Sequence, residues 1–516
     1  MDRAAYRLGW YLTLGGLLAV IDTTVMVVAA PRLTEEFDAD LPTIGWVTSA
    51  YALALVAVMP TAAWVIGRFG ARPAYLAALA LFTAGSLLAG CAWGVGPLIA
   101  FRVVQGLGGG LLNPVGMAIA LAAVPPDRRG RMMSLAGLPV LIGPLVGPIL
   151  GGTLLDHASW RWIFWINVPI GVAAVLLGRW VLPVTDPRPG ARLDVPGLLL
   201  LCPGLTLAVY GLSVTGDRGG LLSAPVLVPL LAGAALVVVF VRRAGRVPHP
   251  LLRLSVLGTP GMAAGAATVG LFAAGYFGSF LIAPAYVQIV RGDSATLAGT
   301  IGIPQALATG LMLQVATRLV DRASPRLVVG LGIATALAGT VARVAVLDAD
   351  TSYPLLAALG AVTGLGTGAT LMPTMAAASR RLSRGDIPSG TALLTTVSNT
   401  AVAAGTALIA ALLAWLVGRF APGLGEDGIV AAARLAPADR TAYAADLARA
   451  VQLTLAASGV LLALAWLTSR RLPADRSTPA TGDTGPAEAR PRAGQADSVG
   501  TAAATEGCQP PAVTAQ

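Results

Sequence analysis

The fold of this chain is decided by residues 102–114, which read RVVQGLGGGLLNP and lie inside a long apolar segment. At 3.6 residues per turn, a helix brings four of these positions onto one face: Arg102, Gln105, Gly109 and Asn113. A polar stripe cannot face lipid, so it must face the interior of a helix bundle or a water-filled cavity. The glycines let a neighbouring backbone approach closely. The stretch therefore predicts a membrane helix inside a bundle. Arg102 either clamps neighbouring helices or takes part in a proton pathway, and the two roles are compatible.

The rest of the chain has the composition of a membrane protein. Hydrophobic residues make up 56% of its 516 positions, charged residues make up 12%, and the mean hydropathy is +0.75. Apolar stretches of about 20 residues, long enough to cross a bilayer as helices, recur without the period-two alternation of a barrel. We predict an all-α polytopic protein with fourteen membrane spans, which begin near Leu8, Ile44, Ala74, Pro97, Met132, Trp162, Val195, Ser223, Gly261, Leu297, Arg326, Tyr353, Pro388 and Ala450.

The charges of the loops predict the orientation of these spans. All 35 basic residues are Arg, and alternate loops are rich in Arg on one side and in acids on the other. The positive-inside rule places the Arg-rich loops and both termini in the cytoplasm, as expected for a multi-pass protein of the cell membrane. The net charge of +10 is then explained by arginines that meet anionic lipid headgroups. The expected partner is therefore the lipid bilayer, with no role for nucleic acid.

A single carboxylate, Asp22, lies inside the first apolar segment, whereas the other acids fall in predicted loops, at span ends or in the C-terminal tail. An isolated charge at this depth costs at least about 3 kcal/mol, so an intramembrane acid is a functional candidate, usually a proton or cation site. The alternative is a structural acid that snorkels to the interface or lines a pore. Because Asp22 has no second carboxylate near it in the predicted spans, we favour the proton site.

The fifth predicted span contains glycines four residues apart. Residues 143–152 read GPLVGPILGG, with small or helix-bending positions at Gly143, Pro144, Gly147, Pro148, Gly151 and Gly152. Glycines at this spacing form a groove for another helix, and the prolines remove backbone donors and bend the span. One interpretation is tight helix packing, and a second, compatible one is a hinge-like seal between two halves of the molecule.

The chain repeats itself loosely, which predicts two halves. Residues 68–72 (RFGAR) follow the second span, and residues 318–326 (RLVDRASPR) follow the tenth. Two halves around a central substrate site are a transporter design. We predict an N-terminal six-helix bundle at 1–193, two inserted linker helices with a cytoplasmic loop at 194–260, a C-terminal six-helix bundle at 261–472 with an external loop at 418–449, and a disordered cytoplasmic tail at 473–516. A short amphipathic helix is expected at 436–450.

Aromatic residues mark the ninth predicted span, where Phe272, Tyr276 and Phe280 lie along one helical face. Aromatic side chains that line a cavity suit flat, apolar or cationic ligands, but the same pattern is common in ordinary helix packing. The two histidines, His157 and His249, fall in loops predicted on opposite faces. Because the sequence has no cluster of His, Cys or acids, we expect neither an enzyme nor a metal site. Because it has no Walker-type sequence, we do not expect ATP to drive the cycle.

These motifs together resemble the major facilitator superfamily, and within it the family of fourteen-span drug–proton antiporters. The resemblance rests on residues 21–31, 102–110, 143–152, 159–171 (SWRWIFWINVPIG), 284–288 and 304–305. It implies the major facilitator fold, in which two six-helix bundles are supplemented by two central helices. It also implies that Asp22 and Arg102 couple protons and that residues 143–152 act as an antiporter motif. The expected cytoplasmic gate comprises Arg68, Arg72, Asp321 and Arg322. The expected cavity residues are Met26, Gln105, Asn113, Phe272, Tyr276 and Phe280.

Two positions depart from the pattern of that family. Gly67 stands where the loop after the second span usually has an Asp that latches one conformation, although Asp321 keeps the equivalent acid in the second half. Val27 replaces an Asn of the first-span motif. Both departures bear on the conformational balance and on substrate selectivity.

The expected function is secondary active transport, with small amphipathic drugs or metabolites exported in exchange for protons by alternating access. No cofactor is required, because the proton gradient drives the cycle, and a monomer is expected to suffice. Two alternatives on the same fold stay open: a proton-coupled uptake symporter and an exporter dedicated to one secondary metabolite.

Overall fold

A computed structural model describes residues 3–39, 41–125, 128–184, 192–213, 223–248, 250–280, 282–320, 323–383, 385–424, 431–432, 435 and 437–474. The described residues all belong to one compact unit, which spans residues 1–477. The predicted tail, apart from residues 473–474, lies outside the described residues, as do Asp321, Arg322 and His249. The described part of this unit is helical, as predicted for this class of protein.

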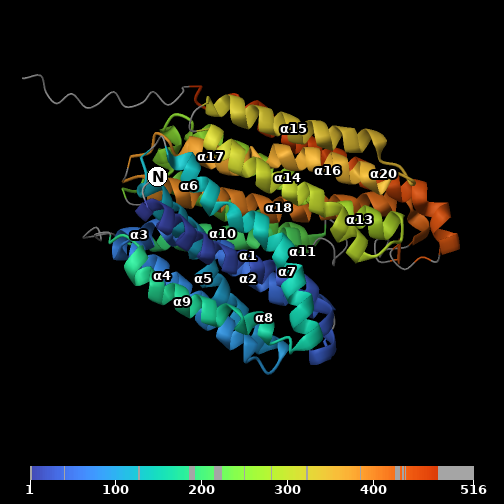
Figure 1. The fold of residues 1–516 in the computed structure, drawn as a ribbon, viewed down its shortest axis with the longest axis horizontal. Coiled ribbons are helices and arrows are strands. Elements are labelled where there is room, and N and C mark those ends of the chain that lie inside the picture. The colour runs from blue at the N-terminus through green and yellow to red at the C-terminus, as the bar shows by residue number, and fades with distance from the viewer. Residues whose placement is uncertain are drawn as a thin grey trace, which may run out of the picture. The chain divides into compact units, whose positions relative to one another are not determined.

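The first bundle is built from the N-terminal helices (Figure 1). Its elements are α1 (Arg3–Phe37), α2 (Leu41–Val58), η1 (Met59–Thr61), α3 (Ala62–Phe69), α4 (Ala71–Gly90), α5 (Val95–Ala122), α6 (Arg129–Ala136), α7 (Leu138–His157), α8 (Trp162–Trp165) and α9 (Asn167–Val181). Helix α5 packs between α2 and α4, and α1 packs on α7. The predicted polar stripe on α5 therefore lies inside the bundle.

The second bundle follows an inserted helical pair. The pair consists of α10 (Val195–Ser213) and α11 (Ala224–Ala244), and a linker containing η3 (Leu254–Gly258) leads onward. The second bundle consists of α12 (Met262–Phe280), α13 (Ile282–Ala285), the π-helix η4 (Tyr286–Val290), α14 (Ala295–Leu319), α15 (Pro325–Val346), α16 (Tyr353–Gly368), α17 (Leu371–Ala378), α18 (Ile387–Phe420), η5 (Pro422–Leu424) and α20 (Pro437–Ser469). Helix α10 contacts α2 of the first bundle and α18 of the second, so the inserted pair borders the seam between the bundles.

Twelve helical segments among the described residues are long and apolar enough to cross a membrane. A helix stands at the place of every predicted span, but the fifth and tenth predicted spans are not among these twelve. The fifth lies in α6 and α7, and the tenth lies in α14; α7 and α14 have 20 and 25 residues, enough for the bilayer by length. The polytopic helical class is confirmed, whereas the count of fourteen spans stays a prediction.

The predicted loop at 418–449 is shorter in the structure. Helix α18 continues to Phe420, and α20 begins at Pro437 and runs without a break into the last span. The helix expected at 436–450 is thus the first part of α20 and not a separate amphipathic helix. Its sequence offered no stop signal between residues 437 and 469, such as a proline or glycine pair, that would end a helix.

Glycines set the spacing of the central helices, as the sequence predicts. A Cβ atom at Gly106 would lie 2.6 Å from the backbone oxygen of Tyr51 on α2, and one at Gly108 would lie 2.4 Å from the backbone nitrogen of Phe82 on α4. On the opposing helix, a Cβ at Gly85 would lie 2.6 Å from the Gln105 backbone. Any side chain at these positions would force the helices apart, so the glycines bring α2, α4 and α5 into backbone contact.

The described hydrogen bonds between the two bundles lie at the end that carries Arg68, Arg72 and Arg129, which is called the basic end below. Arg129, the first residue of α6, donates to the carbonyl oxygens of Ser379 and Arg380, just beyond α17. Gln314 of α14 donates to the carbonyl oxygen of Ser134 of α6 at 3.1 Å. In this conformation the bundles are therefore joined at the basic end.

Candidate functional site

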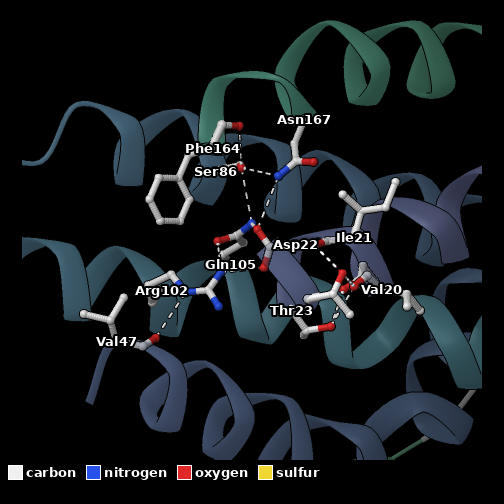
Figure 2. A network of polar contacts seen from close by, with 12 residues as sticks. Val20, Ile21, Asp22, Thr23, Val47, Ser86, Arg102, Gln105, Phe164 and Asn167 are labelled. Atoms are coloured by element: carbon white, nitrogen blue, oxygen red, sulfur yellow. Dashed lines mark hydrogen bonds and ion pairs between the residues drawn. The ribbon is translucent and has the colours of Figure 1, made fainter. Parts of the chain in front are cut away.

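An ion pair lies at the centre of the first bundle. Arg102 Nη1 of α5 stands 2.5 Å from Asp22 Oδ2 of α1, and both side chains have 0% exposure (Figure 2). The sequence placed each residue inside the membrane separately, and the structure brings them together. Removing one partner from such a buried pair leaves an uncompensated charge, which costs about 3–5 kcal/mol.

The second oxygen of Asp22 is also occupied. Gln105 Nε2 donates to Asp22 Oδ1 at 2.8 Å, and Asn167 Nδ2 donates to the same oxygen at 3.3 Å (Figure 2). Donors therefore reach both carboxylate oxygens, an arrangement suited to the ionised form, because an ionised carboxylate only accepts hydrogen bonds. These contacts tie α1 to both α5 and α9.

Ser86 of α4 connects this network to its neighbours. Its hydroxyl accepts hydrogen bonds from Gln105 at 3.2 Å and from Asn167 at 3.0 Å, and it donates to the Phe164 carbonyl of α8 at 2.9 Å. Ser86, Gln105 and Asn167 are each at most 1% exposed. The network thus links five helices of one bundle, and a shift of any of these helices would disturb the environment of Asp22.

The Arg102 guanidinium is held on several sides. Its Nε donates to the Val47 carbonyl of α2 at 3.2 Å, its Nη1 also donates to Gln105 Oε1 at 2.7 Å, and its carbon lies 4.1 Å from the centre of the Tyr51 ring. The Tyr51 hydroxyl has room because Gly109 lacks a side chain, since a Cβ there would lie 2.7 Å from it. Arg102 Nη2 and Tyr51 Oη have no described hydrogen-bond partner. The guanidinium is consequently fixed in place, but both N–H groups of Nη2 stay unused.

The glycine motif of α7 lies behind the Asp22 segment. A Cβ at Gly143 would lie 2.2 Å from Val20 Cγ1, and one at Gly147 would lie 2.0 Å from Thr24 Oγ1. Val20 and Thr24 flank Asp22 by two positions on each side, so they face away from it on helix α1. The predicted groove is thus occupied by α1 of the same bundle, not by the opposite half. Helix α7 also contacts α14 of the second bundle, so the seal between halves that the sequence suggested stays a prediction.

The other glycines of the motif differ in their surroundings. A Cβ at Gly151 would lie 3.1 Å from Val25 Cγ1, whereas nothing lies within 4 Å of a Cβ at Gly152. The side chains of Pro144 and Pro148 are outside the described part of the structure. Three of the four glycines in the motif therefore contact α1.

Three residues were predicted to line a cavity in the first bundle. Met26 is 1% exposed and packs in an apolar cluster with Val25 and Ala29, so it does not line an open cavity in this conformation. Gln105 is buried in the Asp22 network instead. Asn113 shares the helical face of Arg102, but it is exposed and lies outside the network. A periodic stripe predicts a face of a helix, and it does not predict how far along that face the solvent reaches.

The predicted aromatic face of α12 is only partly correct. Phe272 and Tyr276 stack at 5.9 Å between ring centres, and both pack against α15 and α20 with Ile333 and Leu462. Phe280 is 57% exposed and does not join them, because it is eight residues beyond Phe272 and the helix face has drifted by then. Phe272 is fully buried in helix packing, and the ring of Tyr276 also contacts that of Phe277 at 5.2 Å between centres.

The gate predicted at the basic end is described only in part, because Asp321 and Arg322 lie outside the described residues. Arg68 is exposed, and Arg72 donates to the Arg179 carbonyl of α9 in its own bundle. The bond between bundles comes instead from Arg129, which sequence reasoning grouped with other loop arginines. Its burial, followed by the nearby charge of Arg380, lowers the pKa of the Arg129 guanidinium. A signal for Arg129 in the sequence is weak, since three arginines stand within residues 128–131.

Ser86, Asn167 and Tyr51 were also missed as site residues. None of the three belongs to a polar stripe as long as that of α5, and Asn167 lies in the stretch 159–171 already singled out. Among the described residues, no group of three or more His, Cys, Asp or Glu is placed to hold a metal ion. His157, at the end of α7, contacts only its own helix at the Thr153 carbonyl in the bonds described.

The helical bundles and the buried ion pair define a class of membrane transporter, and comparisons with known proteins identify the family. The model of the Major Facilitator Superfamily matches residues 12–313. The Multidrug resistance protein B homolog of Mycobacterium tuberculosis is 37% identical over 418 residues, which cover 80% of this chain and 77% of that protein. The putative multidrug resistance protein MdtD of Salmonella typhimurium is 32% identical over 327 residues, or 62% of this chain and 68% of that protein.

Solved structures agree on the fold. The human organic anion transporter MFSD10 superposes with a TM-score of 0.61 at 14% identity, covering 90% of this chain and 100% of that one. The proton:xylose symporter XylE gives 0.58 at 15% identity, covering 90% and 94%. This chain therefore belongs to the major facilitator superfamily. Membership of this family indicates a multi-pass membrane transporter that binds small molecules.

Proposed function

We propose that this protein exports small amphipathic molecules from the cytoplasm in exchange for protons, by alternating access in the cell membrane. The proposal rests on one observation above all: the Asp22 carboxylate is fully buried, is paired with Arg102, and is the one buried carboxylate on a described spanning helix. Relatives named for multidrug resistance support amphipathic drugs or metabolites as cargo. An exporter dedicated to a single secondary metabolite is the narrower version of the same proposal.

A proton and Arg102 would compete for Asp22. In the described state the carboxylate accepts bonds from Arg102, Gln105 and Asn167. A proton on Asp22 removes the negative charge and turns one oxygen into a donor, which weakens the bonds that the carboxylate accepts, above all the one from Arg102. Arg102 would then be a buried cation without its counter-ion, which favours a rearrangement of α5 against α1. Protonation is in this way coupled to helix position.

The described conformation fits one step of the cycle. The bundles are joined at the basic end by Arg129 and Gln314, and the positive-inside rule makes that end cytoplasmic. A transporter closed to the cytoplasm with an ionised, paired Asp22 is poised to take up a proton from outside. Opening toward the cytoplasm would then release that proton as a substrate binds.

The experiment is a proton-exchange assay in everted membrane vesicles with an acidic interior. Addition of a lipophilic cation such as ethidium should draw protons out of vesicles that contain the wild-type protein, and a fluorescent pH probe reports the change. Asp22→Asn, which keeps the shape but not the charge, should abolish this exchange at equal expression. Glu35→Gln is the matched control, because it removes an exposed carboxylate from the same helix and should leave exchange intact.

The outcomes separate the proposal from its alternatives. Normal proton-coupled exchange by a well-expressed Asp22→Asn protein would remove Asp22 from the coupling role. If substrate instead leaves the wild-type vesicles together with protons, the protein is an uptake symporter. A panel of unrelated cations distinguishes a multidrug exporter, which moves several of them, from a dedicated one.

A further inference from the structure

A second buried arginine lies in the other bundle. Arg343 is in the last turn of α15 and is 7% exposed. Unlike Arg102, it forms no ion pair with any carboxylate of the described residues, and the Tyr276 side chain of α12 lies near it. The second bundle therefore contains a buried positive charge that the described protein leaves without a counter-ion.

The contacts of Arg343 are few. Its Nη2 donates to Thr363 Oγ1 of α16 at 3.2 Å, while the Thr363 hydroxyl donates its own proton to the Leu359 carbonyl at 3.1 Å. Its Nε is buried and has no hydrogen-bond partner. For comparison, Arg102 is met by a carboxylate, an amide oxygen and a backbone carbonyl. A neutral hydroxyl is the one acceptor described for Arg343.

Two further polar groups adjoin this cluster. Gln305 of α14 donates from Nε2 to the Tyr276 hydroxyl oxygen of α12 at 3.3 Å, and no acceptor is described for the Tyr276 hydroxyl proton. Gln305 is half-buried and lies on the helix that contacts α6 and α7 of the first bundle. The cluster of Arg343, Thr363, Tyr276 and Gln305, called the arginine cluster below, thus has an excess of donors.

The position of Arg343 near a helix end explains only part of this arrangement. A cation in the last turn interacts favourably with the partial negative charge of the helix C-terminus. That interaction does not require the side chain to be buried, and arginines at span ends normally extend to water. Arg343 instead reaches across to α16 and buries Nε without an acceptor, which is unfavourable unless an acceptor arrives.

We propose that the arginine cluster binds a monoanionic group, either a carboxylate on a transported molecule or a small inorganic anion. The planar guanidinium matches a carboxylate through two parallel hydrogen bonds, and a phenol and an amide beside it add neutral donors. A site of this kind selects against a neutral isostere, because such a molecule leaves the guanidinium uncompensated. The carboxylate alternative rests on the proposed export function, whereas the inorganic alternative does not.

The test measures binding by thermal unfolding of the purified protein in detergent, without transport or a proton gradient. The probes are sodium benzoate, its neutral isostere benzamide, and sodium chloride, each compared at constant ionic strength in a bulky sulfonate buffer. Benzoate should raise the unfolding temperature of the wild-type protein and benzamide should not. Stabilisation by chloride alone identifies an inorganic anion, and stabilisation by benzoate alone identifies an organic carboxylate.

Three variants make the result specific. Arg343→Gln should lose the anion-dependent shift, and Arg419→Gln is the matched control, because it removes an exposed arginine near the same end of the molecule. Thr363→Val keeps the charge and should weaken anion binding, which covers the case in which Arg343→Gln does not fold. The proposal is overturned if no anion shifts the wild-type protein more than benzamide does, or if the shift persists in Arg343→Gln. Because no proton-coupled step is measured, failure here leaves the Asp22 proposal untouched.

Discussion

The packing of α1 against α7 can be tested by adding a single methyl group. In Gly143→Ala the new Cβ would lie 2.2 Å from Val20 Cγ1 and 3.0 Å from Val20 Cβ, so α1 must move or Val20 must rotate. Overpacking of this kind costs about 1–3 kcal/mol. Alanine is favoured over glycine in a helix by about 1 kcal/mol, which offsets part of this cost. We expect a net loss of stability of up to about 2 kcal/mol, from those two opposing contributions.

Gly152→Ala is the matched control on the same helix. Nothing lies within 4 Å of its added Cβ, so only the gain in helix propensity applies, up to about 1 kcal/mol. The two alanine variants should therefore differ by the overpacking cost alone and change stability in opposite directions. Unfolding by a denaturing detergent in mixed micelles provides the measurement, and proton exchange in vesicles provides the functional readout.

A rescue mutation completes the cycle. Val20→Ala removes Cγ1, the nearest atom, so Gly143→Ala combined with Val20→Ala should lose less stability than the sum of the two single variants. Proton exchange should recover in the double variant to the same extent, because α1 carries both Val20 and Asp22. Equal stability of Gly143→Ala and Gly152→Ala, together with strictly additive effects of Val20→Ala, would refute the described contact between α1 and α7.

Three further predictions concern charge. Arg102→Ala should impair proton exchange and destabilise the bundle by about 3–5 kcal/mol, since it leaves Asp22 unpaired. Arg102→Lys should keep part of the exchange, because lysine retains the charge but lacks the planar guanidinium. Full activity of Arg102→Ala would reduce the α5 stripe to a scaffold. Arg129→Gln should raise hydrogen exchange of the backbone in α6 and α17, since it loses the bonds that join the bundles, whereas exposed Arg68→Gln should not. Rigid aromatic dications should be exported less well than matched monocations, because Asp22 is the one buried carboxylate on a described spanning helix; equal efflux of both would show that another acid serves the substrate.

The sequence predicted which helices exist and which of their faces are polar, because both follow from periodicity within one segment. Arg102 and Gln105 were placed on one face of α5 in this way, and the structure keeps them there. Their partners Ser86 and Asn167 could not be found by the same means, because neither belongs to a long polar stripe on its own helix. The register between helices depends on side-chain packing across the bundle, and the order of residues along one helix does not encode it.

The wrong expectations have the same origin. The stripe of α5 correctly places Asn113 on the face of Arg102, yet Arg102 is fully buried and Asn113 is exposed, since burial depends on what covers that face at each level. Phe280 was grouped with Phe272, which lies eight residues earlier. In a straight helix with 3.6 residues per turn, side chains at this separation no longer point in the same direction. In the sequence, Arg129 does not differ from its neighbours Arg128 and Arg131. Its bonds to the carbonyl oxygens just beyond α17 depend on the tertiary structure.

The α7 groove and the Asp22 pair are two sides of one helix, and this relation bears on how the bundle works. Helix α1 has Val20 and Thr24 in the glycine groove of α7 on one face and Asp22 against Arg102 of α5 on the other. Because the groove is tight at Gly143 and Gly147, α1 cannot move toward α7. If the Asp22–Arg102 pair separates, the movement therefore falls mainly to α5 or to a rotation of α1. A wider groove would let α1 retreat when Asp22 is protonated, without any consequence for the other helices. If Asp22 takes up a proton as proposed, the glycine motif would direct the resulting movement to α5, the helix that also contacts α18 of the second bundle.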